Sequence, residues 1–324
     1  MKSSTAKASA HPNIALIKYW GNSDDALRLP ANDSLSITLG ALTTTTTVTY
    51  DAALKSDQFT LNHVVQTDPD TARVSAHLDL IRHLAHEQRR AHVESVNSFP
   101  AGAGIASSAS GFAALTVAAC AAAGLTLDST ALSRLARRGS GSAARSMLGG
   151  FVQLHAGSDD ALCFAEQLAD IHHWPLRDLI VVSDRSHKLT GSTGGHHSAP
   201  SSPLQAARVS DAARRIRVCR EAIQERDFHK LAAIAELDSN LMHAIMFTST
   251  PPLLYWNATT IHAMQAVTDL RSKGYEVLYT VDAGPNVHCI CSPSDEETVL
   301  KVLQNLPGVK DVLQSGVGGP PRVL

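Results

Sequence analysis

Hydrophobic and polar residues in the first half of the chain alternate between a strand period and a helix period. Threonine alternates with apolar residues over 34–50, which is typical of a strand or a hairpin. Apolar residues recur at helical spacing over 71–95 and predict a helix there. An alanine-rich run predicts a buried helix over 112–123, and polar residues at 128–130 offer N-caps for another helix, which continues through Leu135. The apolar positions of the helix over 71–95 are Val74, Leu78, Ile81 and Leu84.

The second half combines helices with short apolar strands. A stretch rich in glycine, serine, histidine and proline over 190–203 predicts a loop, and Pro251–Pro252 ends a helical pattern. Strands and helices interleave without a constant β-α-β repeat, so we predict an α+β fold. The predicted strands begin at Phe151 and cover 179–183, 276–281 and 287–291, and the predicted helices cover 204–225, 227–246, 257–273 and 296–304.

Length and composition are those of an ordinary globular protein. The chain has 324 residues, of which 44% are hydrophobic and 18% charged, which is enough for a sizeable core in two domains. We predict a boundary near 184–203, with domains over 1–183 and 184–324.

Charge and hydrophobicity exclude several functional classes. With a net charge of −2, nothing indicates binding to nucleic acid or, through a polybasic segment, to a membrane. The first residues lack an apolar segment of signal-peptide length, and the longest apolar run, 113–125, is too short to span a bilayer. We therefore expect a cytoplasmic protein.

Cysteines and histidines do not form a recognisable metal-site pattern. The five cysteines contain no C-x-x-C pair, which favours reduced thiols over a disulfide framework or a zinc site. The 16 histidines include the adjacent pairs His172–His173 and His196–His197, but adjacent residues do not share a face of a helix or strand. We predict no histidine metal site.

Residues 99–111, F-P-A-G-A-G-I-A-S-S-A-S-G, have the composition of an anion-binding loop. Small residues let the backbone approach a phosphate, and the N–H groups at the start of the following helix favour the anion. A turn that only caps the helix explains the same residues equally well. The segment lacks G-K-[ST] and G-x-G-x-x-G, so it is neither a Walker loop nor a dinucleotide fingerprint.

Three further clusters carry charged residues suited to catalysis. Lys18 lies beside two aromatic residues, which can desolvate its ammonium, although a surface lysine at a strand end is the alternative. The segment Arg138–Ser146 contains serines, glycines and Arg145, a set that suits an oxyanion or, alternatively, the capped start of a helix. Asp282 follows an apolar strand in D-A-G-P-N, where a simple β-turn is the alternative. Together with the small-residue loop, these clusters indicate phosphoryl transfer.

Five motifs follow one another along the chain. They are N-I-A-x-x-K-Y-W-G, L-P-x-N-x-S-x-S-x-T-L, F-P-x-x-x-G-x-A-S-S-A-x-G-F-A-A-L, R-x-G-S-G-S-A-x-R-S-x-x-G-G and D-A-G-P-N, and D-S-N at Asp238 and P-P-L-L-Y at Pro251 accompany them. From Asn13 to Asn286 they resemble the mevalonate diphosphate decarboxylases, within the superfamily of galacto-, homoserine, mevalonate and phosphomevalonate kinases. The resemblance implies a two-domain fold with an N-terminal, ATP-binding, ribosomal-protein-S5-like domain and a C-terminal, substrate-side, ferredoxin-like α/β sandwich.

The resemblance also implies an ATP- and Mg²⁺-dependent decarboxylase in isoprenoid biosynthesis, assembled as a homodimer. The γ-phosphoryl group of ATP moves to the tertiary 3-hydroxyl of a mevalonate phosphate, and loss of phosphate and CO₂ then gives an isopentenyl phosphate ester. In this family pattern Asp282 orients or deprotonates the hydroxyl, Lys18 stabilises the hydroxyl and the transferred phosphoryl group, and Arg145 holds the carboxylate. The implied cofactor-binding residues are Gly102, Ala103, Gly104, Ile105, Ala106, Ser107 and Ser108, with Ser108 also near Mg²⁺; the implied substrate-binding residues are Asn13, Tyr19, Trp20, Asn22, Arg73, Ser140, Ser142, Arg145 and Ser192.

Two departures from the family pattern bear on the substrate. The family reads K-Y-W-G-K where this chain has Asn22, and S-S-T or S-S-R where this chain has T-G-S-T-G-G over 190–195. Each lost charge-assisted contact weakens binding of a second phosphate by about 1.5–3 kcal/mol. The sequence therefore predicts mevalonate 5-phosphate as the substrate. Mevalonate 5-diphosphate is the alternative if Arg185 or Lys188 replaces the lost charge.

Two other functions compete with decarboxylation. One is a kinase of the same superfamily that phosphorylates mevalonate and stops, and the other is a binding protein that kept the fold without catalysis. The joint presence of Lys18, Arg145 and Asp282 favours the decarboxylase over both.

Overall fold

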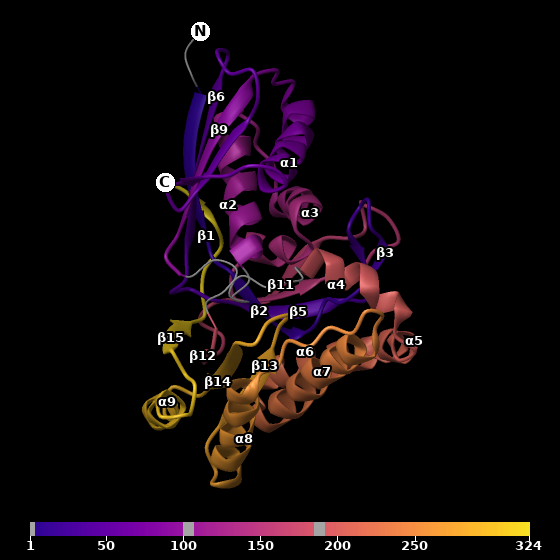
Figure 1. The fold of residues 1–324 in the computed structure, drawn as a ribbon, viewed down its shortest axis with the longest axis vertical. Helices are drawn as coiled ribbons and strands as arrows, with labels where there is room; N and C mark the ends of the chain where they lie inside the picture. The colour runs from indigo at the N-terminus through magenta and orange to yellow at the C-terminus, as the bar shows by residue number, and fades with distance from the viewer. Residues whose placement is uncertain (1–3, 100–106, 185–191) are drawn as a thin grey trace.

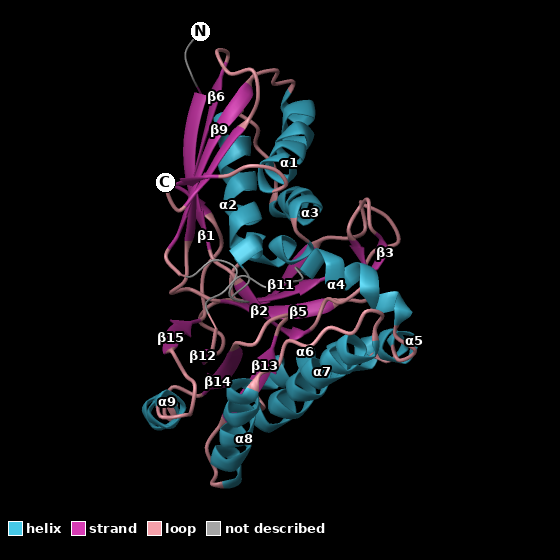
Figure 2. Ribbon diagram, viewed as in Figure 1, coloured by secondary structure: helices cyan, strands magenta, loops and turns pink. Residues whose placement is uncertain are grey.

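The computed structural model describes residues 4–99, 107–184 and 192–324. Helices and strands occur in an irregular order along these residues, without a repeated alternation of the two, which confirms the predicted α+β class (Figure 2). Three main sheets follow one another along the long axis of the molecule (Figure 1). The middle sheet and its junction with the third position the candidate catalytic residues.

The first sheet has the strand order β16-β1-β6-β9-β7-β8 and is antiparallel except for the parallel pair β7 and β9. Helix α2 lies against β1 and β6, and α1 and α3 pack beside it (Figure 1). The alanines of α2 explain its contact with the sheet, because short side chains let a helix approach a sheet closely. The bounds are β1 Ser4–Ala10, β6 Thr44–Asp51, β7 Gln58–Leu61, β8 Val64–Val65, β9 Arg90–Asn97, β16 Arg322–Val323, α1 Asp70–Ala85, α2 Ser107–Ala122 and α3 Ser129–Gly139.

The middle sheet has the order β11-β10-β5-β2. Every residue of β2, β5 and β10 is buried, since the 3₁₀ helix η1 and other elements cover both faces. A short ribbon of β3 and β4 extends from it. The bounds are β2 Asn13–Ile17, β3 Asn22–Asp24, β4 Leu29–Pro30, β5 Ser34–Thr38, η1 Gly141–Met147, β10 Phe151–Leu154 and β11 Ala165–Ala169.

The third sheet has the order β13-β14-β12-β15 and is antiparallel. Helices α8 and α9 share a hydrophobic core with one of its faces, while α6 and α7 pack toward the middle sheet. The bounds are β12 Arg177–Val182, α4 Ser192–Ser198, η2 Ala199–Ser201, α5 Gln205–Ser210, α6 Ala212–Glu225, α7 Phe228–Thr248, α8 Ala258–Ser272, β13 Val277–Val281, β14 Val287–Cys291, α9 Glu296–Gln304 and β15 Asp311–Gly316.

One hydrophobic core joins the two halves of the chain. Ile14 and Leu35 of the middle sheet lie in the same buried cluster as Ile180 and Leu278 of the third sheet and Ile216 of α6. Separating the halves would expose this apolar surface to water, which is unfavourable. The shared core therefore fixes the end of β2 relative to the end of β13.

The helix predicted over 71–95 is wrong beyond residue 85. Helix α1 ends at Ala85, His86 adopts a left-handed φ of 52°, and the chain then enters β9. Leu84 is exposed, whereas His77 faces the core and contacts the Thr116 hydroxyl at 2.8 Å. The alternating burial of β9 has a strand period, which the helical spacing before it obscured.

Three other predictions need correction. The hairpin alternative for 34–50 is wrong, because β5 and β6 belong to different sheets. The loop predicted over 190–203 is wrong for residues 192–201, which form α4 and η2. There a Cβ on Gly195 would lie 2.3 Å from the Trp20 ring, so close packing favours a helix that local propensity does not. The helix predicted over 204–225 is divided at Asp211.

The remaining predicted elements are confirmed apart from their ends: α2, α3, α7, α8, α9, β10, β12, β13 and β14. The predicted boundary between 183 and 184 falls just after β12, which pairs with β14 and β15. We therefore propose a division before Arg177 instead.

Among the described helices, none has the length and apolar character needed to cross a membrane.

Gly150, just before β10, provides a test of the packing between β10 and β11. Its φ is 77°, and a Cβ there would lie 2.1 Å from the carbonyl oxygen of Ala169. Gly150→Ala should lower the free energy of unfolding by roughly 2–5 kcal/mol, because the left-handed conformation costs about 1–2 and overpacking about 1–3. Gly274→Ala is the matched control, since its φ is 94° and nothing lies within 4 Å of its Cβ. Urea denaturation of both variants measures the difference, and equal losses would contradict the steric account.

Candidate active site

Lys18 and Asp282 meet at the ends of two strands from different halves of the chain. Lys18 directly follows β2, and Asp282 directly follows β13. The ammonium of Lys18 donates a hydrogen bond to Oδ1 of Asp282 at 2.6 Å. The Lys18 side chain is 1% exposed, whereas that of Asp282 retains 27%. The surface-lysine alternative is therefore wrong, and the carboxylate remains accessible to a ligand.

The two groups shift each other's pKa. Burial lowers the pKa of Lys18, and the attraction of Asp282 and Asp238 offsets part of this effect. Burial alone would raise the pKa of Asp282, but Lys18, His288 and Arg145 outweigh it and hold that pKa below its ordinary value. A carboxylate with a lowered pKa is a weak base. It can orient a hydroxyl and accept its proton once that hydroxyl becomes more acidic.

Arg145 is a buried cation held by neutral groups. It lies on η1 and is 3% exposed. Its Nε and Nη2 donate to Oδ1 of Asn13 at 3.2 and 3.1 Å, and its Nη1 donates to the hydroxyl of Ser34 at 2.6 Å. These bonds leave two of the five guanidinium N–H groups without a hydrogen-bond partner among the described residues. Burial lowers the pKa of Arg145 to about 10, so it stays charged at neutral pH and can bind an anion.

Three hydroxyl groups lie between the starts of α2 and η1. The Oγ atoms of Ser108 and Ser140 are 3.3 Å apart, and those of Ser140 and Ser142 are 3.4 Å apart. A Cβ on Gly141 would lie 1.9 Å from the ring of Tyr19, so only glycine lets this ring approach the segment. The first turn of α2 carries no acidic residue. Hydroxyls beside a helix N-terminus suit phosphate oxygens.

The side chain of Asn22 lies between a tyrosine hydroxyl and an aspartate carboxylate and contacts both. The hydroxyl of Tyr19 donates to Oδ1 of Asn22, and Nδ2 of Asn22 donates to Oδ1 of Asp25 at 2.6 Å. Asp25 also lies 2.9 Å from Nδ1 of His197 on α4. Position 22 therefore presents an amide tied to a carboxylate.

Trp20 lies where α4 packs on the segment after β2. The ring of His196 is 4.5 Å from that of Tyr19 and 4.9 Å from that of Trp20, and the N–H of Gly21 donates to His196 Nδ1 at 3.0 Å. Burial lowers the pKa of His196 to about 3, so this histidine is neutral at pH 7. Trp20 therefore anchors α4 beside Tyr19, and its contact with a substrate stays a prediction.

Arg73 lies on α1, beside the segment that precedes η1. Its Nη2 donates to the carbonyl oxygen of Gly139 at 2.9 Å, and its guanidinium lies 4.5 Å from the Phe112 ring centre. Arg28 donates from Nε to the adjacent carbonyl of Arg138 at 3.1 Å. Burial and the nearby Arg28 lower the pKa of Arg73 to about 10, so Arg73 stays charged at neutral pH. Two cations therefore donate hydrogen bonds to neighbouring carbonyls just before Ser140.

Some predicted residues lie outside the described part of the chain. They are Gly102, Ala103, Gly104, Ile105 and Ala106, and the compensating cations Arg185 and Lys188. Ser107 begins α2 and Ser192 begins α4, but the Ser192 side chain is not described.

Sequence reasoning did not select Ser34, which holds Arg145, or Asp238, which contacts the backbone of Lys18. Both residues belong to motifs of the family, L-P-x-N-x-S and D-S-N, and membership of these motifs could have selected them as site residues.

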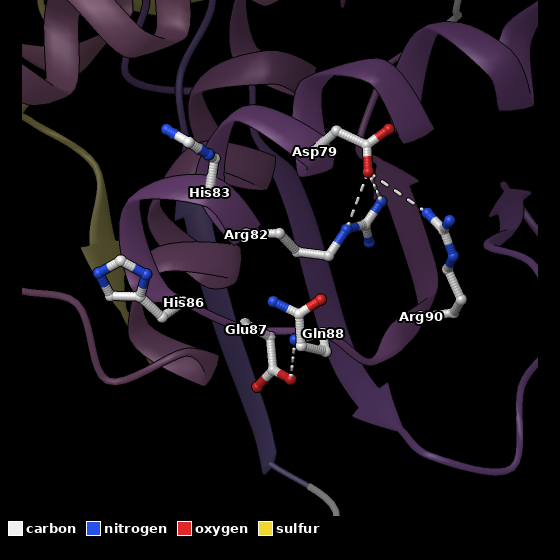
Figure 3. A pocket seen from close by; sticks show the side chains of 7 residues that line it. All are labelled: Asp79, Arg82, His83, His86, Glu87, Gln88 and Arg90. Atoms are coloured by element: carbon white, nitrogen blue, oxygen red, sulfur yellow. Dashed lines mark hydrogen bonds and ion pairs between the residues drawn. The ribbon is translucent and has the colours of Figure 1, made fainter.

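A hollow at the C-terminal end of α1 is a separate feature. Asp79, Arg82, His83, His86, Glu87, Gln88 and Arg90 line it (Figure 3). Arg82 and Arg90 already pair with Asp79, so their charge is largely used within the protein. In the described residues, no group of three or more His, Cys, Asp or Glu side chains is arranged to hold a metal ion.

Two family models match most of the chain. Residues 10–165 match the diphosphomevalonate decarboxylase-like N-terminal domain, and residues 178–323 match the mevalonate 5-diphosphate decarboxylase C-terminal domain. The diphosphomevalonate decarboxylase of Candida albicans is 36% identical, over 99% of this chain and 95% of that protein.

Solved structures agree in fold over the whole chain. Mevalonate diphosphate decarboxylase from Staphylococcus aureus superposes with a TM-score of 0.95 at 34% identity, covering 100% of this chain and 98% of that one. A complex of MDDEF with MVAPP, AMPPCP and magnesium gives a TM-score of 0.94 at 37% identity, covering 100% and 99%. These matches confirm the two-domain superfamily fold that the motifs implied. The chain belongs to the diphosphomevalonate decarboxylase family.

Proposed function

We propose that the protein catalyses ATP-dependent decarboxylation of mevalonate 5-diphosphate to isopentenyl diphosphate, ADP, phosphate and CO₂. The observation that carries this proposal is the ion pair between the buried Lys18 and the accessible carboxylate of Asp282, with the buried cation Arg145 close enough to lower the pKa of that carboxyl. The names of the relatives support the same activity.

Lys18 and Asp282 serve the first chemical step. Asp282 orients the 3-hydroxyl and takes its proton as the new O–P bond forms, which matches a lowered pKa. Lys18 neutralises the charge that develops on the oxygen and on the transferred phosphoryl group. Because its ammonium is enclosed, little water screens its field.

Arg145 serves the second step. Its two remaining N–H groups suit the planar fork of a carboxylate. A carboxylate held there stays ionised, so its electrons are available when phosphate departs from the tertiary carbon. Loss of CO₂ then completes the double bond.

The described residues fit ATP and magnesium as co-substrate and metal. The start of α2, with Ser107 and Ser108, would hold phosphate oxygens of ATP, and the hydroxyls of Ser140 and Ser142 beside Ser108 would hold those of the substrate. Ser108 would also lie near the metal, whose chemistry is to neutralise phosphate charge. The MDDEF complex with AMPPCP, an ATP analogue, and magnesium supports this pairing.

Two observations support a substrate with two phosphates. The relatives are named for the diphosphate, and Arg28 and Arg73, which donate to the carbonyls of Arg138 and Gly139 just before Ser140, would supply cations for a second phosphate. The comparisons therefore favour the diphosphate over the monophosphate that the sequence predicts.

Mevalonate 5-phosphate is the second candidate because Asn22 carries no charge and Asp25 beside it is an anion. The homodimer and the cytoplasmic location remain predictions.

Asp282→Asn should reduce kcat more than tenfold, a loss above about 1.4 kcal/mol, because an amide cannot accept the hydroxyl proton. The folded state and ATP binding should persist, since the replacement is nearly isosteric. Asp160→Asn is the matched control, because Asp160 has a similar exposed fraction of 35% and pairs with Arg134 and Arg137 instead of Lys18. Retention of more than a tenth of the wild-type kcat would show that Asp282 lacks the proposed role.

Arg145→Lys should raise the substrate KM and lower kcat, with ATP affinity less affected, although charge is preserved. A lysine cannot reproduce parallel hydrogen bonds to a carboxylate together with those to Asn13 and Ser34. Arg137→Lys is the control, since Arg137 is equally buried and contacts the Leu27 carbonyl instead. Similar kinetics for both variants would make Arg145 a structural residue.

Substrate preference is decided by kcat/KM for the diphosphate and the monophosphate, measured side by side. The main proposal predicts a higher value for the diphosphate, and a higher value for the monophosphate would establish the second candidate. Asn22→Lys should raise the diphosphate-to-monophosphate ratio about tenfold, since one charge-assisted contact is worth roughly 1.5–3 kcal/mol and Asp25 neutralises part of the new charge. Ser23→Lys adds the same charge at an exposed neighbouring position and should leave the ratio unchanged. Equal effects of the two lysines would contradict the assignment of Asn22.

A further inference from the structure

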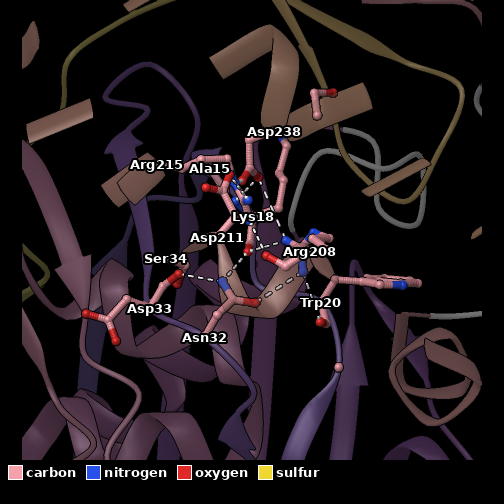
Figure 4. A network of polar contacts seen from close by, with 12 residues as sticks. Ala15, Lys18, Trp20, Asn32, Asp33, Ser34, Arg208, Asp211, Arg215 and Asp238 are labelled. Atoms are coloured by element: carbon pink, nitrogen blue, oxygen red, sulfur yellow. Dashed lines mark hydrogen bonds and ion pairs between the residues drawn. The ribbon is translucent and has the colours of Figure 1, made fainter. Parts of the chain in front are cut away.

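The backbone of Lys18 is held by buried side chains instead of by its own sheet. The pairing of β2 with β5 becomes irregular between Ala15 and Ile17, and β2 ends there. The N–H of Lys18 donates to Oδ1 of Asp238 on α7 at 2.7 Å. Figure 4 shows this contact within a network of polar side chains around Lys18. The residue that carries the ammonium is thus tied to a helix of the C-terminal half.

The carbonyl group of Lys18 is held as firmly as its N–H. Nδ2 of Asn32 and Nη2 of Arg208 both donate to this oxygen, at 3.0 and 2.9 Å. Arg208 also donates to Oδ1 of Asn32 at 3.1 Å, so the two donors support each other (Figure 4). The backbone on both sides of the Lys18 Cα atom therefore has fixed partners.

The next residue of α7 holds the other member of the catalytic pair. The hydroxyl of Ser239 accepts a hydrogen bond from the N–H of Val281 at 3.0 Å and donates to the carbonyl of Val281 at 3.3 Å. Val281 directly precedes Asp282. Asp238 and Ser239 are both fully buried. Adjacent residues of one helix thus contact the backbones that carry Lys18 and Asp282.

The charge on Asp238 is itself fixed. Its Oδ2 accepts from Nε of Arg215 at 2.6 Å, and both side chains are 0% exposed. Arg215 also pairs with Asp211 at 2.9 Å and donates to the carbonyl of Arg208 at 2.8 Å. Buried ion pairs are a poor source of net stability because desolvation offsets their attraction. What this pair does supply is a carboxylate with a single permitted orientation.

We propose that Asp238 and Ser239 are positioning residues that set the separation between the Lys18 ammonium and the Asp282 carboxylate. The proposal rests on the proposed function only for the identity of the reaction. Helix α7 is the common reference for two strand ends that come from different halves of the chain. A displacement of either end by a fraction of an ångström would lengthen the ion pair and misdirect both groups.

The test uses matched pairs of variants. Asp238→Asn is compared with Asp57→Asn, because Asp57 is also buried, also accepts a backbone N–H, from Ala91 at 2.8 Å, and also pairs with an arginine, Arg82. Ser239→Ala is compared with Ser133→Ala, since Ser133 is a fully buried helix serine whose hydroxyl accepts the N–H of Ala165 at 3.0 Å. Both controls lie in the N-terminal half, away from Lys18.

The readouts are melting temperature, KM for each substrate, and kcat measured as ADP formation. We expect all four variants to lose thermal stability, but only the α7 variants to lose kcat, about ten- to hundredfold for Asp238→Asn and at least about threefold for Ser239→Ala, with each KM within about threefold of wild type. If Asp238→Asn does not fold, Ser239→Ala decides the question, because it leaves no charge unpaired. A folded Ser239→Ala with the kcat of its control would overturn the proposal.

This outcome is separate from the proposed function. The wild-type reaction products identify the chemistry, whereas the ratio of variant to wild-type kcat tests the positioning. ADP formation reports phosphoryl transfer whether or not CO₂ follows.

Discussion

The ammonium of Lys18 is the group on which the rest of the site depends. A lysine that is 1% exposed can remain charged only beside an anion, and its partner, Asp282, comes from the other half of the chain. The contact between the two halves therefore also forms the Lys18–Asp282 pair, which we propose to be catalytic. The hydrophobic cluster shared by the middle and third sheets supplies the driving force for that contact.

The distribution of buried charge suits the anionic substrate that we propose. Asp238 balances Arg215, and Asp282 balances Lys18. Arg145 has hydrogen bonds only to the neutral groups of Asn13 and Ser34 among the described residues. The attraction of Asp282 offsets only part of the cost of burying Arg145, so the carboxylate of the proposed substrate would stabilise this cation further.

The sequence predicted much of the fold and the identity of the charged residues, but not their support. Long periodic segments such as α7 and α8 were correctly predicted, and α8, predicted over 257–273, covers Ala258–Ser272 with Asn257 as its N-cap. The predictions failed where tertiary contacts override local preference, as at Gly195 of α4, or where a helix continues into a strand pattern, as after Ala85. Lys18 and Asp282 are 264 residues apart in the sequence, so no local pattern predicts their contact. Only the resemblance to the family assigned both residues to the same reaction. Ser34 and Asp238 were missed as site residues because a buried serine or aspartate in a motif does not reveal which backbone or guanidinium it contacts.

In the reaction that we propose, the site transfers a phosphoryl group to the substrate and then removes CO₂ from the same molecule. The most direct test is the stoichiometry of products from purified protein with ATP, magnesium and mevalonate 5-diphosphate or 5-phosphate. We expect ADP, inorganic phosphate and CO₂ in equal amounts. ADP without CO₂, with the phosphoryl group retained on the substrate, would contradict the proposal and establish a kinase.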